Sequence, residues 1–266
     1  SSSPAIADID GDGQFDLAAT AKQVFAWSGT GRELLDADQN PLTWGQFYGQ
    51  GEGFGSVTLA DLDPAPGKEI VVATWDATAR YVVAIRGDGS PLAGWPQALV
   101  PAGEGYRGAQ VAPVVANLQL YGGPEVLLAA RDGRLYGWHA DGSEIADGDA
   151  NPATRGVLFD TQSPFLRCAP AVADLDPARE GFEIAIGSTD GKLYVLDFQG
   201  QPLPGWPRST WGTGTPYTGA FTSGISVGDL DGDTRLEMVF VDGMGLLHAL
   251  RTDGSAGLWI ATSGGG

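Results

Sequence analysis

The sequence Asp8-Ile9-Asp10-Gly11-Asp12-Gly13-Gln14-Phe15-Asp16 recurs near the other end of the chain as Asp229-Leu230-Asp231-Gly232-Asp233-Thr234-Arg235-Leu236-Glu237. Both copies place carboxylates at loop positions 1, 3, 5 and 9. Like charges this close repel one another unless a cation lies among them. Each copy follows a short alternating segment and precedes an apolar one, so the pattern predicts a strand, a metal loop and a second strand.

Three degenerate copies of this loop lie between the two intact ones, at residues 61–69, 117–125 and 174–183. The five loops start at residues 8, 61, 117, 174 and 229, which gives steps of 53, 56, 57 and 55 residues. A repeat slightly longer than fifty residues, with several short strands in each copy, indicates the blades of a β-propeller.

The remainder of each unit predicts further strands. An apolar run such as 184–188 is followed by an Asp-Gly turn, a third strand and a second turn. Asp-Gly between apolar runs is the strongest short hairpin signal. Gly-Trp-Pro at 94–96 and 205–207 opens a fourth, outer strand, where an edge position tolerates proline. The sequence therefore predicts one all-β domain, a β-propeller of five four-stranded blades at about 1–55, 56–110, 111–168, 169–223 and 224–266.

Composition restricts the classes of partner. The 266 residues include 15 Lys and Arg against 33 Asp and Glu, for a net charge of −18. Nucleic acid is not expected as a partner, because binding phosphate requires a basic face. No apolar run approaches the ~20 residues of a membrane span. The one cysteine, Cys168, excludes an intramolecular disulfide, and we expect it to be a small buried residue near the propeller centre.

Calcium is the cofactor that the two intact loops favour. Ca²⁺ takes six to eight oxygen ligands, whereas Mg²⁺ demands a stricter octahedron. The expected ligands are Asp8, Asp10, Asp12, Asp16 and the carbonyl of Gln14 in the first loop, and Asp229, Asp231, Asp233, Glu237 and the carbonyl of Arg235 in the fifth. Thr234 stands where the first loop has Gly13, which weakens the fifth loop. The alternative is a solvated acidic turn.

The degenerate loops are weaker candidates. The possible ligands are Asp61, Asp63, Gly67 and Glu69 in the second unit, and Asp174, Asp176 and Glu183 in the fourth. Pro64 and Pro177 favour rigid turns in these two loops instead. The third unit offers Asn117, Gln119 and Tyr121 at the corresponding positions, so we expect no metal there.

Several segments resemble the FG-GAP/VCBS repeat family, the integrin-α-like β-propellers. They are the openings at 3–13 and 169–176, the middle segment at 187–196 and the closing segment at 202–207. The resemblance covers essentially the whole chain. It implies Ca²⁺ in the loops between first and second strands, and an extracellular, periplasmic or cell-surface module for adhesion, carbohydrate binding or protein binding. Integrin propellers have seven blades, whereas this sequence shows five.

The histidines His139 and His248 are the first candidates for catalysis. His248 aligns with aromatic and apolar residues of the other third strands, which favours a buried histidine. No nucleophile elbow, Cys/His pair or His-rich metal set is present. We therefore expect no enzyme. The enzymatic alternative is a quinoprotein-like oxidoreductase, because Asp-Gly-Lys-Leu-Tyr at 190–194 also resembles the blades of that family.

A binding surface is expected on the face opposite the metal loops. The loops that link each outer strand to the next inner strand lie there, and they are rich in glycine and aromatic residues. The candidates for partner or ligand contact are Phe54, Tyr106, Arg107, Phe165 and Tyr217. The alternative is that these rings pack between blades. The leading hypothesis is a non-enzymatic interaction module or a subunit of a larger assembly, with a protein or carbohydrate partner; the alternative is a lectin.

Overall fold

The computed structural model describes residues 2–35, 44–49, 51–76, 79–100, 111–151, 154–162, 165–209, 224–242 and 247–255, without the side chain of Phe54. The regular secondary structure of these residues consists of β-strands alone. They include no helix with the length and apolar character needed to cross a bilayer.

The described strands form five sheets. The first sheet contains β1 (Ala5–Ala7), β2 (Asp16–Thr20), β3 (Val24–Ser28) and β4 (Gln46–Tyr48). The second contains β5 (Glu52–Ala60), β6 (Glu69–Trp75), β7 (Arg80–Ile85) and β8 (Gln97–Ala98). The third contains β9 (Val114–Ala116), β10 (Glu125–Ala129), β11 (Arg134–His139) and β12 (Val157–Asp160). The fourth contains β13 (Ala171–Ala173), β14 (Glu183–Gly187), β15 (Lys192–Leu196) and β16 (Arg208–Ser209). The fifth contains β17 (Ser226–Gly228), β18 (Glu237–Val241) and β19 (Leu247–Leu250).

Each sheet is a meander in which consecutive strands pair. The pairing is antiparallel throughout, for example between β14 and β15. The predicted strands and their order are therefore confirmed for the first four units. The fourth strand expected in the fifth unit, at 256–262, lies outside the described residues.

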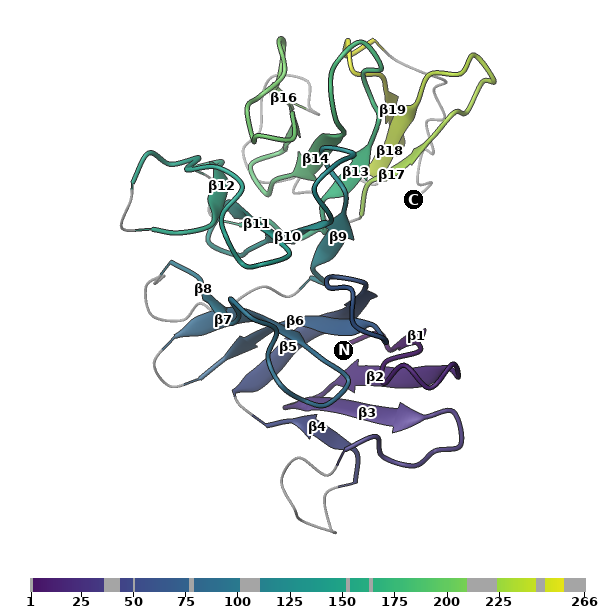
Figure 1. Ribbon diagram of the computed structural model, residues 1–266. Helices are drawn as coiled ribbons and strands as arrows, with labels where there is room; N and C mark the ends of the chain where they lie inside the picture. The colour runs from purple at the N-terminus through teal and green to yellow at the C-terminus, as the bar shows by residue number, and fades with distance from the viewer. Residues whose placement is uncertain are drawn as a thin grey trace, which may run out of the picture.

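The five sheets follow one another in chain order around a common centre (Figure 1). The first strands of neighbouring sheets are in contact, as β1 is with β5, β5 with β9, and β13 with β17. The short fourth strands β4, β8, β12 and β16 lie at the periphery in the same view. This is the radial arrangement that the repeat period predicts.

Burial differs between the inner and the end sheets. The second strands β6, β10 and β14 are buried on both faces along almost their whole length. In β2, by contrast, buried residues alternate with partly exposed ones. A strand between two sheets needs apolar residues on both faces, whereas a strand covered on one face alternates. The inner sheets are thus packed between two neighbours.

Four hydrophobic clusters join the sheets in pairs, first to second, second to third, third to fourth, and fourth to fifth. The second residue of each acidic loop enters the cluster shared with the following sheet: these residues are Ile9, Leu62, Leu118 and Leu175, all at most 7% exposed. The equivalent residue of the fifth loop, Leu230, is 49% exposed. The apolar residue inside the acidic loop therefore packs against the following sheet.

The first sheet shows the complementary surface. The middle residue of each later first strand packs against the preceding sheet, as Val115, Val172 and Val227 do. Its counterpart Ile6 is 68% exposed. Within the described part of the chain, no hydrophobic cluster joins the fifth sheet to the first. Contact between the first and fifth units stays a prediction.

Two tryptophans of the Gly-Trp-Pro motifs connect neighbouring sheets. Trp95 donates its Nε1–H to the carbonyl of Ala140 at 2.9 Å, and Trp206 donates to the carbonyl of Thr252 at 2.7 Å. Both rings are 7% exposed. The motif therefore fastens the second sheet to the third and the fourth sheet to the fifth.

Candidate functional site

The two ends of the sheets carry different loops. In a four-stranded meander, the loop between the first and second strands and the turn between the third and fourth strands lie at the same end. The acidic loops therefore share one face with turns such as Arg86–Ser90 and Arg251–Ser255, each closed by a backbone hydrogen bond between its end residues. We call this end the loop face. The turns between the second and third strands and the connections between sheets lie on the opposite face.

The carboxylate at the end of the acidic loop has a structural role in every unit; it stands at the ninth loop position, or at the tenth in the longer fourth loop. Each one accepts the backbone N–H of the loop's second residue: Asp16 from Ile9 at 2.8 Å, Glu69 from Leu62 at 2.7 Å, Glu125 from Leu118 at 2.7 Å, Glu183 from Leu175 at 2.8 Å, and Glu237 from Leu230 at 2.9 Å. All five are at most 3% exposed. Since Glu125 makes this bond in a unit without the other carboxylates, the bond itself requires no metal.

The first loop brings together three of its four predicted carboxylates. Asp8, Asp10 and Asp16 each offer an oxygen, and these atoms all lie within 4.8 Å of one another. Asp8 also accepts the N–H groups of Gly11 at 2.8 Å and Gly13 at 2.9 Å, which curls the loop around it. Burial raises the pKa of Asp16, and the charges of Asp10 and Asp12 raise it further. A cation in this group would offset that repulsion.

The first loop also touches the second sheet. The amide of Lys68 donates to the carbonyl of Asp8 at 2.9 Å. Gly67 has a φ of +97°, and a Cβ there would lie 2.3 Å from the carbonyl oxygen of Ile9. Only glycine fits such a left-handed position against a backbone atom. The first loop is therefore part of the contact between the first and second sheets.

The fifth loop repeats the backbone geometry of the first. Asp229 accepts the N–H groups of Gly232 at 2.7 Å and Thr234 at 2.9 Å. Asp229, Asp231 and Glu237 form a second group of carboxylates within 4.8 Å. Thr234 has a φ of +72°, where the first loop has Gly13 at +85°. A β-branched residue is strained in this region, and the weaker metal binding expected of the fifth loop stays a prediction.

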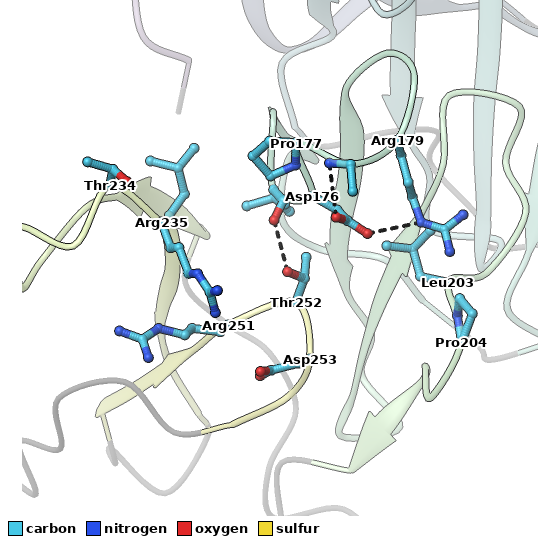
Figure 2. A pocket seen from close by; sticks show the side chains of 13 residues that line it. Asp176, Pro177, Arg179, Leu203, Pro204, Thr234, Arg235, Arg251, Thr252 and Asp253 are labelled. Carbon is cyan, nitrogen blue, oxygen red and sulfur yellow. Dashed lines mark hydrogen bonds and ion pairs between the residues drawn. The ribbon is translucent and has the colours of Figure 1, made fainter.

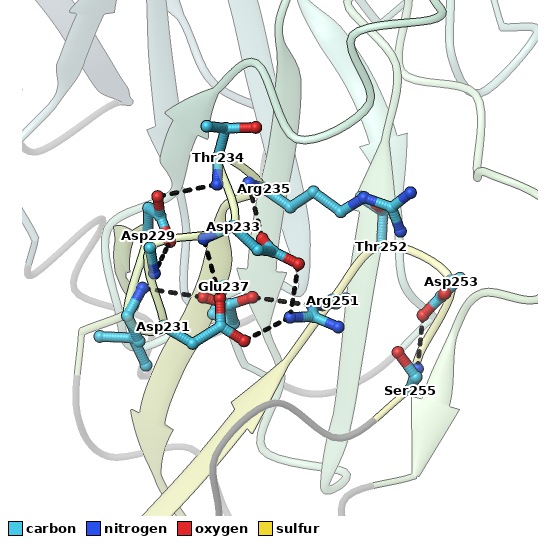
Figure 3. A network of polar contacts seen from close by, with 12 residues as sticks. Asp229, Asp231, Asp233, Thr234, Arg235, Glu237, Arg251, Thr252, Asp253 and Ser255 are labelled. Carbon is cyan, nitrogen blue, oxygen red and sulfur yellow. Dashed lines mark hydrogen bonds and ion pairs between the residues drawn. The ribbon is translucent and has the colours of Figure 1, made fainter.

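Figure 3 shows that Arg251 points into the fifth loop. Its Nη2 donates to Asp231 at 2.6 Å and to Asp233 at 3.0 Å, and its Nε donates to Glu237 at 2.8 Å. The guanidinium thus lies among three of the four carboxylates predicted to hold an ion. For Gln14 and Arg235, the described contacts are amide N–H donations to Asp12 at 2.8 Å and Asp233 at 2.9 Å, so their carbonyls as ligands stay a prediction.

Arg251 occupies a position that exists in all five sheets, which we call the exit position. The residues there are Ser28, Arg86, His139, Asp197 and Arg251, and each donates its backbone N–H to the carbonyl four residues later. In the second unit, Arg86 donates from Nε and Nη2 to Asp63 at 3.0 and 2.8 Å. In the third, His139 Nδ1 lies 3.3 Å from Glu125 Oε1. The exit side chain therefore faces the acidic loop of its own sheet in the second, third and fifth units.

The fourth unit has a carboxylate at the exit position. Asp197 accepts the N–H groups of Gln199 at 3.0 Å and Gln201 at 2.8 Å in its own turn. Glu183 is fully buried, and its Oε1 has no hydrogen-bond partner among the described residues. Burial raises the pKa of Glu183, and the neighbouring charges of Asp176 and Asp174 raise it further. The fourth loop thus holds a buried carboxylate that lacks a cationic neighbour of the kind found in the fifth.

Two more of the predicted weaker ligands, Asp61 and Asp176, form ion pairs with basic side chains. Lys68 Nζ lies 2.6 Å from Asp61, and Arg179 Nε lies 3.1 Å from Asp176. Asp174 is exposed on the loop face. Metal binding by the second and fourth loops stays a prediction, although internal cations already face part of each donor set.

A pocket of about 570 Å³ opens on the loop face between the fourth and fifth sheets (Figure 2). Arg179, Arg235 and Arg251 line it together with Asp176 and Asp253. Two of these arginines already bond carboxylates, Arg179 to Asp176 and Arg251 to the fifth loop. Sequence reasoning did not predict this pocket, because it arises where two loops from different units meet.

Of the residues predicted to contact a partner on the opposite face, Phe165 is the one whose side chain lies in the described part of the chain. Phe165 is partly exposed, and the guanidinium carbons of Arg131 and Arg167 each lie 5.4 Å from its ring centroid. Its carbonyl accepts the N–H of Thr189 at 3.2 Å and the hydroxyl of Thr189 at 3.1 Å. Phe165 is thus held at the junction of the third and fourth sheets. Tyr106, Arg107, Tyr217 and the side chain of Phe54 lie outside the described residues.

The catalytic candidate His248 and the single cysteine, Cys168, are both buried. His248 is 7% exposed, stacks on Phe240, and bonds Asp242 through Nε2 at 2.9 Å, which confirms the buried histidine. Cys168 is 4% exposed, as predicted, and its Sγ contacts the carbonyl of Gly187 at 3.4 Å.

No protein-family model and no curated protein sequence matches the chain. Solved structures do resemble it. BBS1N in complex with ARL6DN has a TM-score of 0.59 at 13% identity, over 98% of this chain and 68% of that one. BamB from Moraxella catarrhalis has 0.58 at 15% identity, over 98% and 67%. Quinohemoprotein alcohol dehydrogenase from Comamonas testosteroni has 0.50 at 15% identity, over 96% and 42%. These structures are β-propellers, so the likeness shows a propeller fold.

Proposed function

We propose that this chain is a non-enzymatic, calcium-stabilised β-propeller that binds a protein partner outside the cytoplasm, as an interaction or adhesion module or as a subunit of a larger assembly. The observation that carries the proposal is the different chemistry of the two faces. The loop face is occupied by carboxylates with structural bonds. The opposite face presents Phe165 beside two guanidinium groups.

The calcium part of the proposal rests on the first loop. Asp8, Asp10 and Asp16 would hold the ion, with Asp12 at the exposed edge. Among the described residues, no basic side chain forms an ion pair with these four carboxylates. A hard cation with flexible coordination suits such an oxygen donor set. Because the loop contacts Gly67 and Lys68, a bound ion would also stiffen the contact between the first two sheets.

We also propose a location outside the cytoplasm, which the exposure of this site supports. The ligands of the first loop lie near the surface, and Asp10 and Asp12 are exposed. Weak calcium sites of extracellular modules have Kd values of about 10⁻⁴–10⁻³ M, and such sites fill only where calcium is abundant.

The partner part of the proposal rests on Phe165. Aromatic and arginine side chains are the types that most often anchor protein interfaces. Arg131 and Arg167 place positive charge beside the ring in a chain of net charge −18. Carboxylates on the partner would complement them. One of the similar propellers, BBS1N, is itself in complex with the protein ARL6DN.

The non-enzymatic part of the proposal rests on the hydrogen bonds that buried titratable groups make inside the fold. The buried carboxylates at the ninth loop positions accept backbone N–H groups, and His248 bonds Asp242 inside the fourth-to-fifth interface. The fold does not decide the question, because one similar propeller is a dehydrogenase. Turnover of an alcohol with a dye acceptor and a bound quinone would contradict this part.

Quantitative capture from an extract of the native source tests the partner surface. The variants are Phe165→Ala with Arg167→Ala, and the matched control is Tyr121→Ala, an aromatic residue 65% exposed on the loop face. We expect the double variant to lose most of the captured partner, a loss of about tenfold or more, while the control captures as the wild type does. Loss in the control alone would place the interface on the loop face instead. Thermal melting of all three proteins verifies that each is folded.

A further inference from the structure

The fifth loop carries its own positive charge. Arg251 reaches three carboxylates with distances of 2.6 to 3.0 Å, and two of them, Asp231 and Glu237, belong to the group that is spaced to hold an ion. Its side chain is 22% exposed, and Glu237 beneath it is fully buried. Three donors fixed in one plane suit several carboxylates at once, which a guanidinium supplies and a lysine does not.

The first loop lacks this internal cation. Its exit residue is Ser28, which faces Asp16 across β2 and β3. The Ser28 hydroxyl lies 2.9 Å from that of Thr30 and accepts the N–H of Arg32 at 3.3 Å, so it is engaged in its own turn. The two most similar loops of the chain thus differ in the residue that faces the carboxylates.

From this difference we propose that the Arg251 guanidinium is the resident cation of the fifth loop, which therefore takes no metal ion, and that the exit residue decides which of the two intact acidic loops, 8–16 and 229–237, takes one. This replaces the ion expected in the fifth loop from the sequence. A divalent cation and the guanidinium would compete for the carboxylates of Asp231 and Glu237, and they would repel each other at that distance. The first-loop half of the inference rests on the proposed calcium site.

Reciprocal substitutions at the exit position test this directly. The set is Arg251→Ser, Ser28→Arg, and the loop variants Asp10→Asn and Asp231→Asn in an otherwise natural chain. Bound calcium is counted by isothermal titration and by equilibrium dialysis at calcium concentrations above the expected Kd. Melting temperatures are recorded with calcium and with excess chelator, and circular dichroism verifies folding.

We expect one ion in the wild type, one in Asp231→Asn and none in Asp10→Asn. Ser28→Arg should bind none, and its melting temperature should no longer respond to chelator. Arg251→Ser should bind two, melt below the wild type in chelator, and recover when calcium is added, because the ion then replaces the lost guanidinium.

Two results would overturn the inference. One is a wild type that binds two ions and loses one in Asp231→Asn; this comparison stands even if Arg251→Ser does not fold. The other is a folded Arg251→Ser that gains no ion over the wild type. A wild type without any ion would instead contradict the calcium proposal for the first loop, while a gain of one ion in Arg251→Ser would still support the role of Arg251.

Discussion

Arg251 Nε donates to Glu237 Oε1 at 2.8 Å, and Glu237 in turn accepts the backbone N–H of Leu230 through Oε2 at 2.9 Å. One buried carboxylate thus connects the exit of the third strand to the loop after the first. The equivalent carboxylate of the first unit, Asp16, bonds Ile9 in the same way and faces Ser28. The first and fifth loops therefore share the same backbone hydrogen bond, but of these two only the fifth holds an arginine side chain among its carboxylates.

The tryptophan contacts between sheets predict a stability effect. Trp206→Phe removes the Nε1–H donor to the Thr252 carbonyl while a ring stays in the interface. A lost hydrogen bond and a smaller ring should lower the free energy of unfolding by about 1–3 kcal/mol. Trp95→Phe should act similarly at the second-to-third interface. Thermal melting measures both, and Trp44→Phe, 65% exposed, is the control that should change little.

Thr234→Gly should stabilise the chain. Thr234 has a left-handed φ of +72°, and relieving a β-branched residue there is worth about 1 kcal/mol after the entropy of glycine is counted. Denaturant unfolding should show a higher midpoint for the variant. Thr252→Gly, on the same face and outside that backbone region, is the comparison expected to destabilise. A lower midpoint for Thr234→Gly would show that the loop gains nothing from a glycine at this position.

An arginine at the exit position of the fourth unit, as in the fifth unit, should stabilise the fold. Asp197→Arg with Gln199→Asp recreates the Arg-x-Asp-Gly turn found at residues 86–89 and 251–254. The new guanidinium would lie beside Glu183, whose Oε1 lacks a hydrogen-bond partner in the described structure. We expect the free energy of unfolding to rise by about 1–2 kcal/mol. Gln199→Asp alone is the control, and an equal gain from it would refute the role of the arginine.

The buried Glu183 carboxyl predicts a pH dependence. Burial raises its pKa above the ordinary value of 4.5, so below that pH the group is protonated in both the folded and the unfolded chain. As the pH rises through the folded-state pKa, a buried charge forms and the group costs stability. Glu183→Gln stays neutral, so the difference in melting temperature between variant and wild type should shift toward the variant from about pH 4.5 upward.

The control for this titration is Glu180→Gln, an exposed carboxyl in the same loop. Melting temperatures of the three proteins are compared at steps between about pH 4 and 8, a range that brackets ordinary carboxyl titration. A constant difference between Glu183→Gln and wild type across the range would show that Glu183 does not change its charge inside the fold.

Much of the fold could be predicted from the sequence because the repeat is local. The loop at 8–16 and its copies mark the first turn of every unit, and Asp-Gly turns mark the next in the third, fourth and fifth units. The sequence pattern also indicates how many faces of a strand are covered. Buried and partly exposed residues alternate in β2, whereas β6 is buried along almost its whole length. Contact between the first and fifth units is not a local property, so it stays a prediction from the number of units alone.

The candidate site could be predicted only in part. The carboxylates of a loop are adjacent in sequence, so Asp8, Asp10 and Asp16 could be assigned to one group. Arg251 lies fourteen residues after Glu237 and enters the loop only through the antiparallel pairing of β18 and β19. Aligning the third strands on their turns places Ser28 and Arg251 at one position, but it does not show that the Arg251 side chain reaches the carboxylates of the loop.

Hydrogen–deuterium exchange in saturating calcium and in excess chelator tests whether calcium binds the first loop while Arg251 takes its place in the fifth. We expect calcium to slow the exchange of the first-loop amides of Gly11, Gly13 and Gln14. The amide of Lys68, which donates to the carbonyl of Asp8, should also exchange more slowly. We expect no calcium effect at residues 230–235, where Arg251 already neutralises the carboxylates. Unchanged exchange in the first loop, or equal protection in both loops, would contradict this assignment of the two cations.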